Sequence, residues 1–272
     1  MRGERAKPPV LKRFGQHFLT DRGVLEGIAA AVATNDSDTI IEIGPGRGAL
    51  TDFLATRPNR LIGIEIDRAL AENLRRRYSS NDRVTIIEQD VLDLDLSSLS
   101  EGPWVVAGNV PYYITTPILF HVLKPPFPRQ AVFLVQREVA QRIVSPPGSK
   151  TYGALSANLQ AVSRAEILMN VPPRAFTPRP KVHSAVVRMT PRNDPVVEGV
   201  EVQRFRTFVQ ALFGMRRKQL GNSLRSASRL SAEEAAALLR DAGIDQKERA
   251  ESLSPSQLAD LMRRAAVISR GS

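Results

Sequence analysis

The chain has 272 residues, no cysteine and a formal net charge of +10, from 38 lysines and arginines against 28 aspartates and glutamates. This length suits one large domain with a smaller one, because domains commonly run about 100–200 residues. The lack of cysteine excludes a disulfide scaffold, a thiolate zinc site and a cysteine nucleophile. With no membrane-length apolar run and no secretory signal, we expect a cytoplasmic protein. The basic excess favours a polyanionic partner, nucleic acid before an anionic membrane.

A basic arm and a helix open the chain. Residues 1–13 carry five lysines and arginines and the pair Pro8-Pro9. Residues 14–21 mix aromatic, polar and glycine positions, and residues 23–34 are predicted to be helical, with Asp21 as a candidate N-cap. We treat residues 1–22 as a separate basic segment.

Short apolar strands and helices then alternate. The predicted strands are 39–43, 61–66, 84–88, 104–107, 131–135, 165–171 and 184–189, and the predicted helices are 48–57, 68–78, 115–123 and 137–144. Strands alternating with such helices indicate βαβ units, and their nearly continuous apolar character indicates a sheet covered on both faces. We therefore predict an α/β, Rossmann-like fold with a doubly wound, mostly parallel seven-stranded sheet.

The chain beyond residue 195 is predicted to be a small all-helical domain. Its helices are predicted at 202–213, 217–226, 231–242 and 254–267. Ser231 and Glu234 have the spacing of a capping box, and Gly243 is placed as a helix stop. The predicted domains are thus 1–22, 23–195 and 196–272.

A glycine loop follows the first strand. Gly44, Gly46 and Gly48 let the backbone turn sharply and approach a ligand, and their spacing matches a variant of the dinucleotide-binding fingerprint. Glu65 ends the second strand, where it can accept hydrogen bonds from ribose hydroxyls, and Asp90 follows the third, where it can accept one from an adenine amino group. The alternative is a tight strand-to-helix turn with solvated acids.

Two cofactors compete for this loop. A nicotinamide cofactor would place its pyrophosphate on the helix N-terminus. Glu42, just before the glycines, would repel that pyrophosphate but suits a cationic sulfonium or ammonium group. This carboxylate favours S-adenosylmethionine, and Glu42, Gly44 and Gly46 are predicted to bind it.

The tetrapeptide Asn109-Val110-Pro111-Tyr112 follows the fourth strand. The Asn109 amide oxygen and the Val110 carbonyl can accept the two N–H bonds of an exocyclic amine. Pro111 fixes φ and stiffens the loop. Tyr112 offers a face for a flipped base, and such stacking is worth about 1–3 kcal/mol. These residues predict methyl transfer to a base amine, mainly by positioning and electrostatics.

With these motifs together, the chain resembles the ribosomal RNA adenine-N6 dimethyltransferases, from about Lys12 to Met262. The similarity is greatest to the bacterial small-subunit branch linked to kasugamycin sensitivity rather than the antibiotic-resistance branch that acts on 23S RNA. The matching stretches are 14–21, 42–48, Glu65, Asp90, 108–112, 176–182, 216–218 and 249–254.

The resemblance implies an S-adenosylmethionine-dependent enzyme that dimethylates two adjacent adenosines near the 3′ end of 16S RNA, late in small-subunit assembly. Cofactor-binding residues would then be His17, Leu19, Glu42, Gly44, Gly46, Glu65, Asp90, Val91 and Asn109. Asn109 to Tyr112 would hold the target adenine, with Phe176 on its other face, although the proline-rich segment around Phe176 can instead bury that ring. Lys12, Arg13, Arg216, Arg217 and Lys218 would contact RNA phosphates.

Some features depart from the family pattern or leave alternatives open. His17 stands where Asn is more usual, Tyr113 where Asn is usual, and His183 where Asp is usual. The three histidines are widely separated, so we expect no metal site. We expect a monomer. A nicotinamide-dependent oxidoreductase and a non-catalytic RNA-binding assembly factor remain alternative hypotheses.

Overall fold

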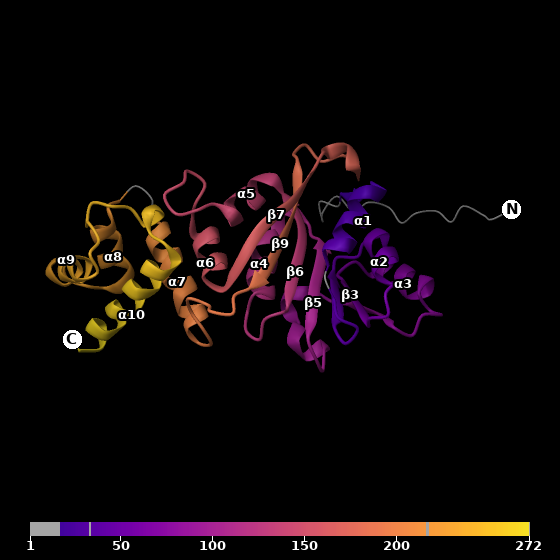
Figure 1. The fold of residues 1–272 in the computed structure, drawn as a ribbon, viewed down its shortest axis with the longest axis horizontal. Helices are drawn as coiled ribbons and strands as arrows, with labels where there is room; N and C mark the ends of the chain where they lie inside the picture. The colour runs from indigo at the N-terminus through magenta and orange to yellow at the C-terminus, as the bar shows by residue number, and fades with distance from the viewer. Residues whose placement is uncertain (1–16, 33, 216–217, 272) are drawn as a thin grey trace. The chain divides into compact units, whose positions relative to one another are not determined.

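The computed structural model describes residues 17–32, 34–215 and 218–271 of the chain (Figure 1). The predicted basic arm, with Lys12 and Arg13, therefore lies outside the described residues, as do Arg216 and Arg217. Among the described helices, none is long and apolar enough to cross a membrane.

A seven-stranded sheet is the framework of the described chain. Its strands are β2 (Thr39–Ile43), β3 (Leu61–Glu65), β4 (Val84–Glu88), β5 (Trp104–Asn109), β6 (Gln130–Gln136), β7 (Ser163–Val171) and β9 (Ser184–Pro191). Their order is β4-β3-β2-β5-β6-β9-β7, with β4 to β6 all parallel and β9 antiparallel to β6. The strand order reverses between β2 and β5, where a doubly wound sheet opens a crevice. The predicted fold class is confirmed.

Apolar side chains cover both faces of the central strands. Every residue of β2 and β3 is buried, and successive side chains of a strand point to opposite faces. Helices α1 (Arg22–Ala31) and α2 (Ala49–Leu54) contribute Ile28 and Leu54 to the same core cluster as Ile40 and Val132. Helix α3 (Arg68–Arg77) packs Leu74 against β4. Helices α4 (Thr115–Val122) and α5 (Arg137–Val144) follow β5 and β6.

A second, two-stranded sheet joins two segments far apart in sequence. Strand β1 (Phe18–Leu19) pairs antiparallel with β8 (Phe176–Thr177), so that Leu19 lies opposite Phe176. The Thr20 amide extends this pairing with a 2.8 Å hydrogen bond to the Ala175 carbonyl. The prediction had no strand at either place, because a two-residue strand is too short to show an alternating pattern. This pairing fixes the residues around position 17 beside the main sheet.

Short 3₁₀ helices complete the connections. They are η2 (Val91–Asp93), η3 (Leu96–Leu99), η4 (Tyr112–Ile114), η5 (Pro173–Ala175) and η6 (Ala250–Ser252). Of these, η2 and η4 directly follow Asp90 and Pro111, at the carboxyl ends of β4 and β5.

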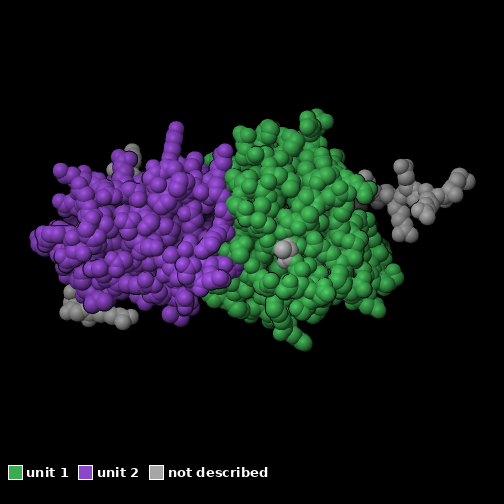
Figure 2. Space-filling model, in the orientation of Figure 1, with its two compact units in different colours: residues 1–140, 166–190 green, residues 141–165, 191–272 purple. Residues whose placement is uncertain are grey.

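The chain divides into two compact units, one of residues 1–140 and 166–190 and the other of residues 141–165 and 191–272 (Figure 2). The chain enters the second unit again at Pro191, close to the predicted domain boundary at residue 195. In this division residues 141–165 group with the C-terminal helices, whereas the predicted division places them in 23–195. Within that second unit the Tyr152 hydroxyl donates to the Leu253 carbonyl at 3.0 Å, and the Tyr152 ring contacts Phe213.

The second unit is mainly helical. Its helices are α6 (Ala154–Val162), α7 (Glu201–Phe213), α8 (Leu220–Ser228), α9 (Ala232–Asp241) and α10 (Pro255–Gly271). The predicted capping box is present, since the Ser231 hydroxyl accepts from the Glu234 amide and Glu234 accepts from the Ser231 amide. Gly243 has the positive φ of 68° expected of a helix stop. Helix α6 was missed, because even its polar Ser156 and Asn158 are buried and it lacks an exposed polar face.

Candidate active site

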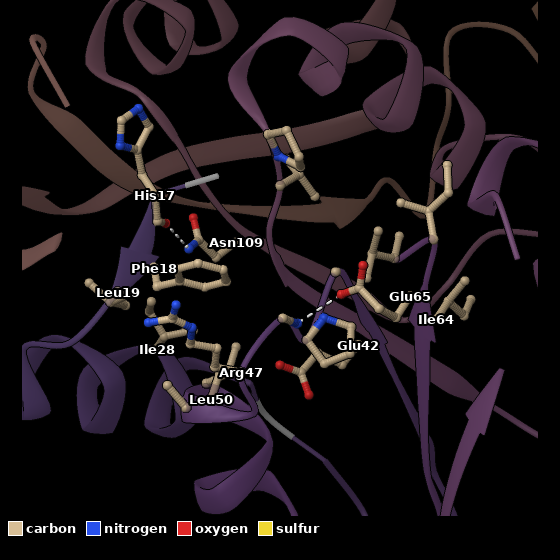
Figure 3. Close-up of a pocket in the computed structure, with 18 of the residues that line it drawn as sticks. His17, Phe18, Leu19, Ile28, Glu42, Arg47, Leu50, Ile64, Glu65 and Asn109 are labelled. Atoms are coloured by element: carbon tan, nitrogen blue, oxygen red, sulfur yellow. Dashed lines mark hydrogen bonds between the residues drawn. The ribbon is translucent and has the colours of Figure 1, made fainter. Parts of the chain in front are cut away.

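A cavity of about 490 Å³ opens at the carboxyl ends of β2 to β5. This volume lies in the range of sites for small molecules and cofactors. All nine predicted cofactor-binding residues line it, as do all four residues of the Asn109–Tyr112 loop. Figure 3 shows side chains from β1, the glycine loop, β3 and β5 converging on this space. The residues that the sequence placed at separate strand ends are therefore brought together.

The glycine loop presents its backbone to the cavity. Gly44, Gly46 and Gly48 have φ values of 67°, 59° and 81°, a region that residues with a side chain rarely adopt. A Cβ at Gly46 would lie 3.1 Å from the Phe18 ring, and one at Gly44 would lie 3.7 Å from the Asn109 carbonyl. The glycines thus permit both the turn and the close approach of β1 and β5.

Glu65 holds this loop in place. One of its carboxylate oxygens accepts from the Gly46 amide at 2.9 Å (Figure 3), and the other accepts from the Asp67 amide at 3.0 Å. Burial raises the pKa of Glu65 above its ordinary value, against the effect of these amide donors. Glu65 therefore ties the end of β3 to the glycine loop in addition to facing the cavity.

Glu42 is buried at the floor of the site. It is 2% exposed, and its Oε2 has no hydrogen-bond partner among the described residues. Burial raises its pKa to about 8; the Thr51 hydroxyl opposes this rise, and the neighbouring charges of Glu65 and Asp52 add to it. Without a ligand this side chain is therefore mostly protonated at neutral pH, and a cationic or hydrogen-bond-donating ligand at Oε2 would favour its charged form.

The acids and apolar groups beyond Glu65 form one wall. Asp90 accepts a hydrogen bond from the Leu92 amide at 3.0 Å and caps η2, and Val91 behind it is buried. Ile66, directly after β3, lines the cavity yet is 49% exposed. The sequence reasoning included Ile66 in a strand but gave it no role. An exposed apolar side chain between two acids offers a surface for a flat ring.

The Asn109–Tyr112 loop forms the opposite wall. The Asn109 amide nitrogen donates to the His17 carbonyl at 3.1 Å (Figure 3). Pro111 has φ −57° and its carbonyl accepts from the Ile114 amide, which starts the η4 turn. Tyr112 is bound through its hydroxyl to the Ser184 hydroxyl at 2.5 Å, and burial raises its pKa.

Phe176 is the predicted site residue that the structure does not bring to the cavity. It is 2% exposed, lies in β8 and belongs to the core cluster with Leu19 and Ile28. The sequence left open that this segment buries the Phe176 ring, and the ring is buried in this structure. Of the predicted RNA-binding residues, only Lys218 is described, and it is exposed.

Arg47 and Tyr113 also line the cavity, and neither was assigned a role from the sequence. The Arg47 guanidinium lies over the Phe18 ring, 4.3 Å from its centroid, at the edge of the glycine loop. Tyr113, noted only as a departure from the family pattern, is 65% exposed at the cavity. The signal available in the sequence for Tyr113 was an aromatic residue directly after the Asn109–Tyr112 motif.

The residues present fit S-adenosylmethionine. Positive-φ glycines expose the backbone, the Glu42 oxygen that has no partner among the described residues suits a cation, and Ile66 suits an adenine ring. No group of three or more possible metal ligands gathers among the described residues. The fold and the cavity define an S-adenosylmethionine-dependent methyltransferase. A family model described as ribosomal RNA adenine dimethylase matches residues 10–266, and the chain belongs to this family.

Individual relatives agree with this family. The chain is 43% identical over 254 residues to ribosomal RNA small subunit methyltransferase A of Acidobacterium capsulatum, covering 92% of this chain and 89% of the relative. It is 43% identical over 260 residues to the protein of the same name from Geobacter sulfurreducens, covering 92% and 93%.

Two solved structures share the fold over nearly the whole chain. The 23S rRNA methyltransferase ErmE has a TM-score of 0.70 at 28% identity, covering 92% of this chain and 99% of that one. A dimethyladenosine transferase from Plasmodium falciparum has a TM-score of 0.77 at 22% identity, covering 90% and 96%, a likeness of fold.

Proposed function

We propose that the chain transfers methyl groups from S-adenosylmethionine to N6 of two adjacent adenosines near the 3′ end of 16S ribosomal RNA, giving N6,N6-dimethyladenosines. The observation that carries this proposal is that the Asn109–Tyr112 loop lines the same cavity as the residues expected to bind the cofactor. The greater identity to the small-subunit relatives than to the 23S enzyme, 43% against 28%, supports the choice of RNA.

When bound, S-adenosylmethionine supplies an electrophilic methyl group on a sulfonium. The adenine amine is a poor nucleophile, because its lone pair is delocalised into the ring. The Asn109 oxygen and the Val110 carbonyl accept its two N–H bonds, which holds the nitrogen and favours a tetrahedral geometry. The chain's contribution is thus mainly preorganised acceptors and orientation.

Tyr112 supplies the stacking face for the flipped adenine in this proposal. Base–aromatic stacking is worth about 1–3 kcal/mol, enough to offset part of the cost of unstacking the base from its RNA neighbours. Phe176 can serve as the opposite face only after a rearrangement that exposes it, since it is 2% exposed here.

The proposed partner is 16S RNA within an immature small subunit, bound by a monomer in the cytoplasm. The relatives are named for the small subunit, and the net charge of +10 suits a polyanion. We assign phosphate contacts to Lys12, Arg13, Arg216, Arg217 and Lys218.

A transfer assay tests the proposed function. Purified protein, tritiated S-adenosylmethionine and small subunits lacking the modification are combined, and incorporation into 16S RNA is measured. We expect methyl groups at N6 of two adjacent adenosines. Normal subunit binding without incorporation would instead support a non-catalytic assembly factor. Calorimetry with S-adenosylmethionine and with NAD(H) separates the methyltransferase from the oxidoreductase alternative.

A further inference from the structure

His17 touches three parts of the target side of the cavity, although its predicted role concerned the cofactor. Its ring stacks on Tyr112, with centroids 5.9 Å apart and planes at 28°. Its Nδ1 lies 2.9 Å from the Pro178 carbonyl, and its own carbonyl accepts from the Asn109 amide. These contacts link segments 92 and 161 residues away in the sequence.

The contact with Asn109 decides which end of that amide faces the substrate. An amide side chain has a nitrogen that only donates and an oxygen that only accepts. The His17 carbonyl also only accepts, so it binds the Asn109 nitrogen, at 3.1 Å. The reversed amide would set two acceptors against each other. The Asn109 oxygen is therefore the atom left to accept an N–H of a base amine.

The imidazole of His17 is itself fixed. The Pro178 carbonyl accepts and cannot donate, so Nδ1 carries the proton in this 2.9 Å contact. The imidazole so held packs on the Tyr112 ring, whose hydroxyl binds Ser184 at 2.5 Å. Ser184 is fully buried at the start of β9, so Tyr112 is restrained at its ring by His17 and at its hydroxyl by the sheet.

We propose that His17 is a positioning residue for the target adenine, orienting the Asn109 amide through its carbonyl and the Tyr112 ring through its imidazole. The proposal rests on the proposed function, because it assigns the substrate of these groups as the adenine amine. An asparagine at position 17, the more usual residue in the family pattern, has no ring to place on Tyr112.

Three substitutions at position 17 test the proposal. His17→Phe keeps a ring on Tyr112 but loses the bond to Pro178, whereas His17→Ala and His17→Asn remove the ring. We expect kcat for methyl transfer to fall by about tenfold to a hundredfold in the Ala and Asn variants, and the Phe variant to recover most of it. The affinity for S-adenosylhomocysteine, measured by calorimetry, should stay close to that of the wild type.

The control is His183→Ala, which removes an exposed imidazole that does not line the cavity. It should transfer methyl groups like the wild type. Thermal unfolding of each variant identifies loss of fold, and the comparison of the Phe with the Asn variant decides the question if the Ala variant unfolds. Unchanged kcat in the Asn variant, equal losses in the Phe and Asn variants, or losses explained wholly by cofactor affinity would overturn the proposal. Absence of methyl transfer by the wild type would contradict the proposed function itself. That outcome is distinct from a failure of the proposed role of His17, which needs an active wild type.

Discussion

Two polar side chains at the cavity are held in opposite ways. Asn109 has its amide nitrogen bound to the His17 carbonyl, so its oxygen has a defined direction. Glu42 is 2% exposed and keeps one oxygen without a described partner. The Asn109 oxygen is thus a preorganised acceptor before the substrate binds. The Glu42 oxygen instead lacks a hydrogen-bond partner among the described residues, and a ligand can supply one.

Asn109 is the residue whose loss should affect catalysis most. Asn109→Ala removes the acceptor, and Asn109→Asp keeps an oxygen but sets a second acceptor against the His17 carbonyl. Both should lower kcat by about 10²- to 10³-fold, as measured by tritium transfer. Asn170→Ala, which changes an exposed asparagine on β7, is the matched control. Full methyl transfer by Asn109→Ala would show that positioning by this side chain is not needed.

Glu42 should make stability depend on pH. Burial raises its pKa to about 8, so between its ordinary value of 4.5 and about 8 the folded protein binds a proton that the unfolded chain has released. The free energy of unfolding of the cofactor-free protein should therefore fall as pH rises through this window. Glu42→Gln should flatten the dependence, leaving the smaller slope due to Glu65, whose pKa is also raised by burial. Urea unfolding at several pH values checks this, and an equal slope in both proteins would count against it.

Among the elements, β2 and β5 are paired so closely that a glycine is needed at their site end. A Cβ at Gly108 would lie 2.6 Å from the Ile43 carbonyl and 3.2 Å from the Phe133 ring. The residue after Gly108 is Asn109, so the packing of the two strands also sets where the Asn109–Tyr112 loop begins.

Gly108→Ala should therefore lower both stability and activity. Because the nearest atom belongs to the backbone, the strands must separate, at a cost of about 1–3 kcal/mol typical of overpacking. Gly102→Ala is the control, since the nearest atom to its Cβ would be 4.0 Å away. Denaturant unfolding compares the two variants. Equal stability of both would refute the close-packing argument.

The elements also indicate what a sequence can reveal. The glycine loop and the acids Glu65 and Asp90 were predictable, because each follows an apolar strand and parallel strands end at one edge of the sheet. The pairing of β1 with β8 and the bond between Tyr112 and Ser184 were not, since they join distant segments without any local pattern. The burial of Phe176 follows from that same unpredicted pairing.

Charge is the property that belongs to the whole molecule. The excess of ten positive charges is distributed over a chain whose buried acids Glu42 and Glu65 lie at the cofactor cavity. Many of the described arginines are already paired, for example Arg263 with Glu201 and Arg264 with Asp260. Charge alone therefore does not identify the residues that bind RNA. Substitution of individual basic residues, with RNA affinity measured, is needed to identify them.

RNA affinity should depend steeply on salt, through the basic residues assigned above. Removing a phosphate contact should weaken binding and reduce the slope of log K against log salt by about one. We expect this for alanine substitution of Lys12 and Arg13, and for that of Arg216, Arg217 and Lys218. Arg264→Ala, in an existing ion pair, serves as the control. Filter binding between low and moderate salt gives the slopes, and slopes equal to that of the control would show that the assigned residues do not contact phosphate.

Dimethylation of two adjacent adenosines of 16S RNA should depend on this chain and on its Asn109 side chain. Mass spectrometry of 16S RNA from cells lacking the protein, complemented with the wild type or with Asn109→Ala, tests it most directly. Dimethyladenosine near the 3′ end should disappear without the protein, return with the wild type and stay absent with Asn109→Ala. Dimethyladenosine that persists in the deleted cells, or that returns with Asn109→Ala, would contradict it.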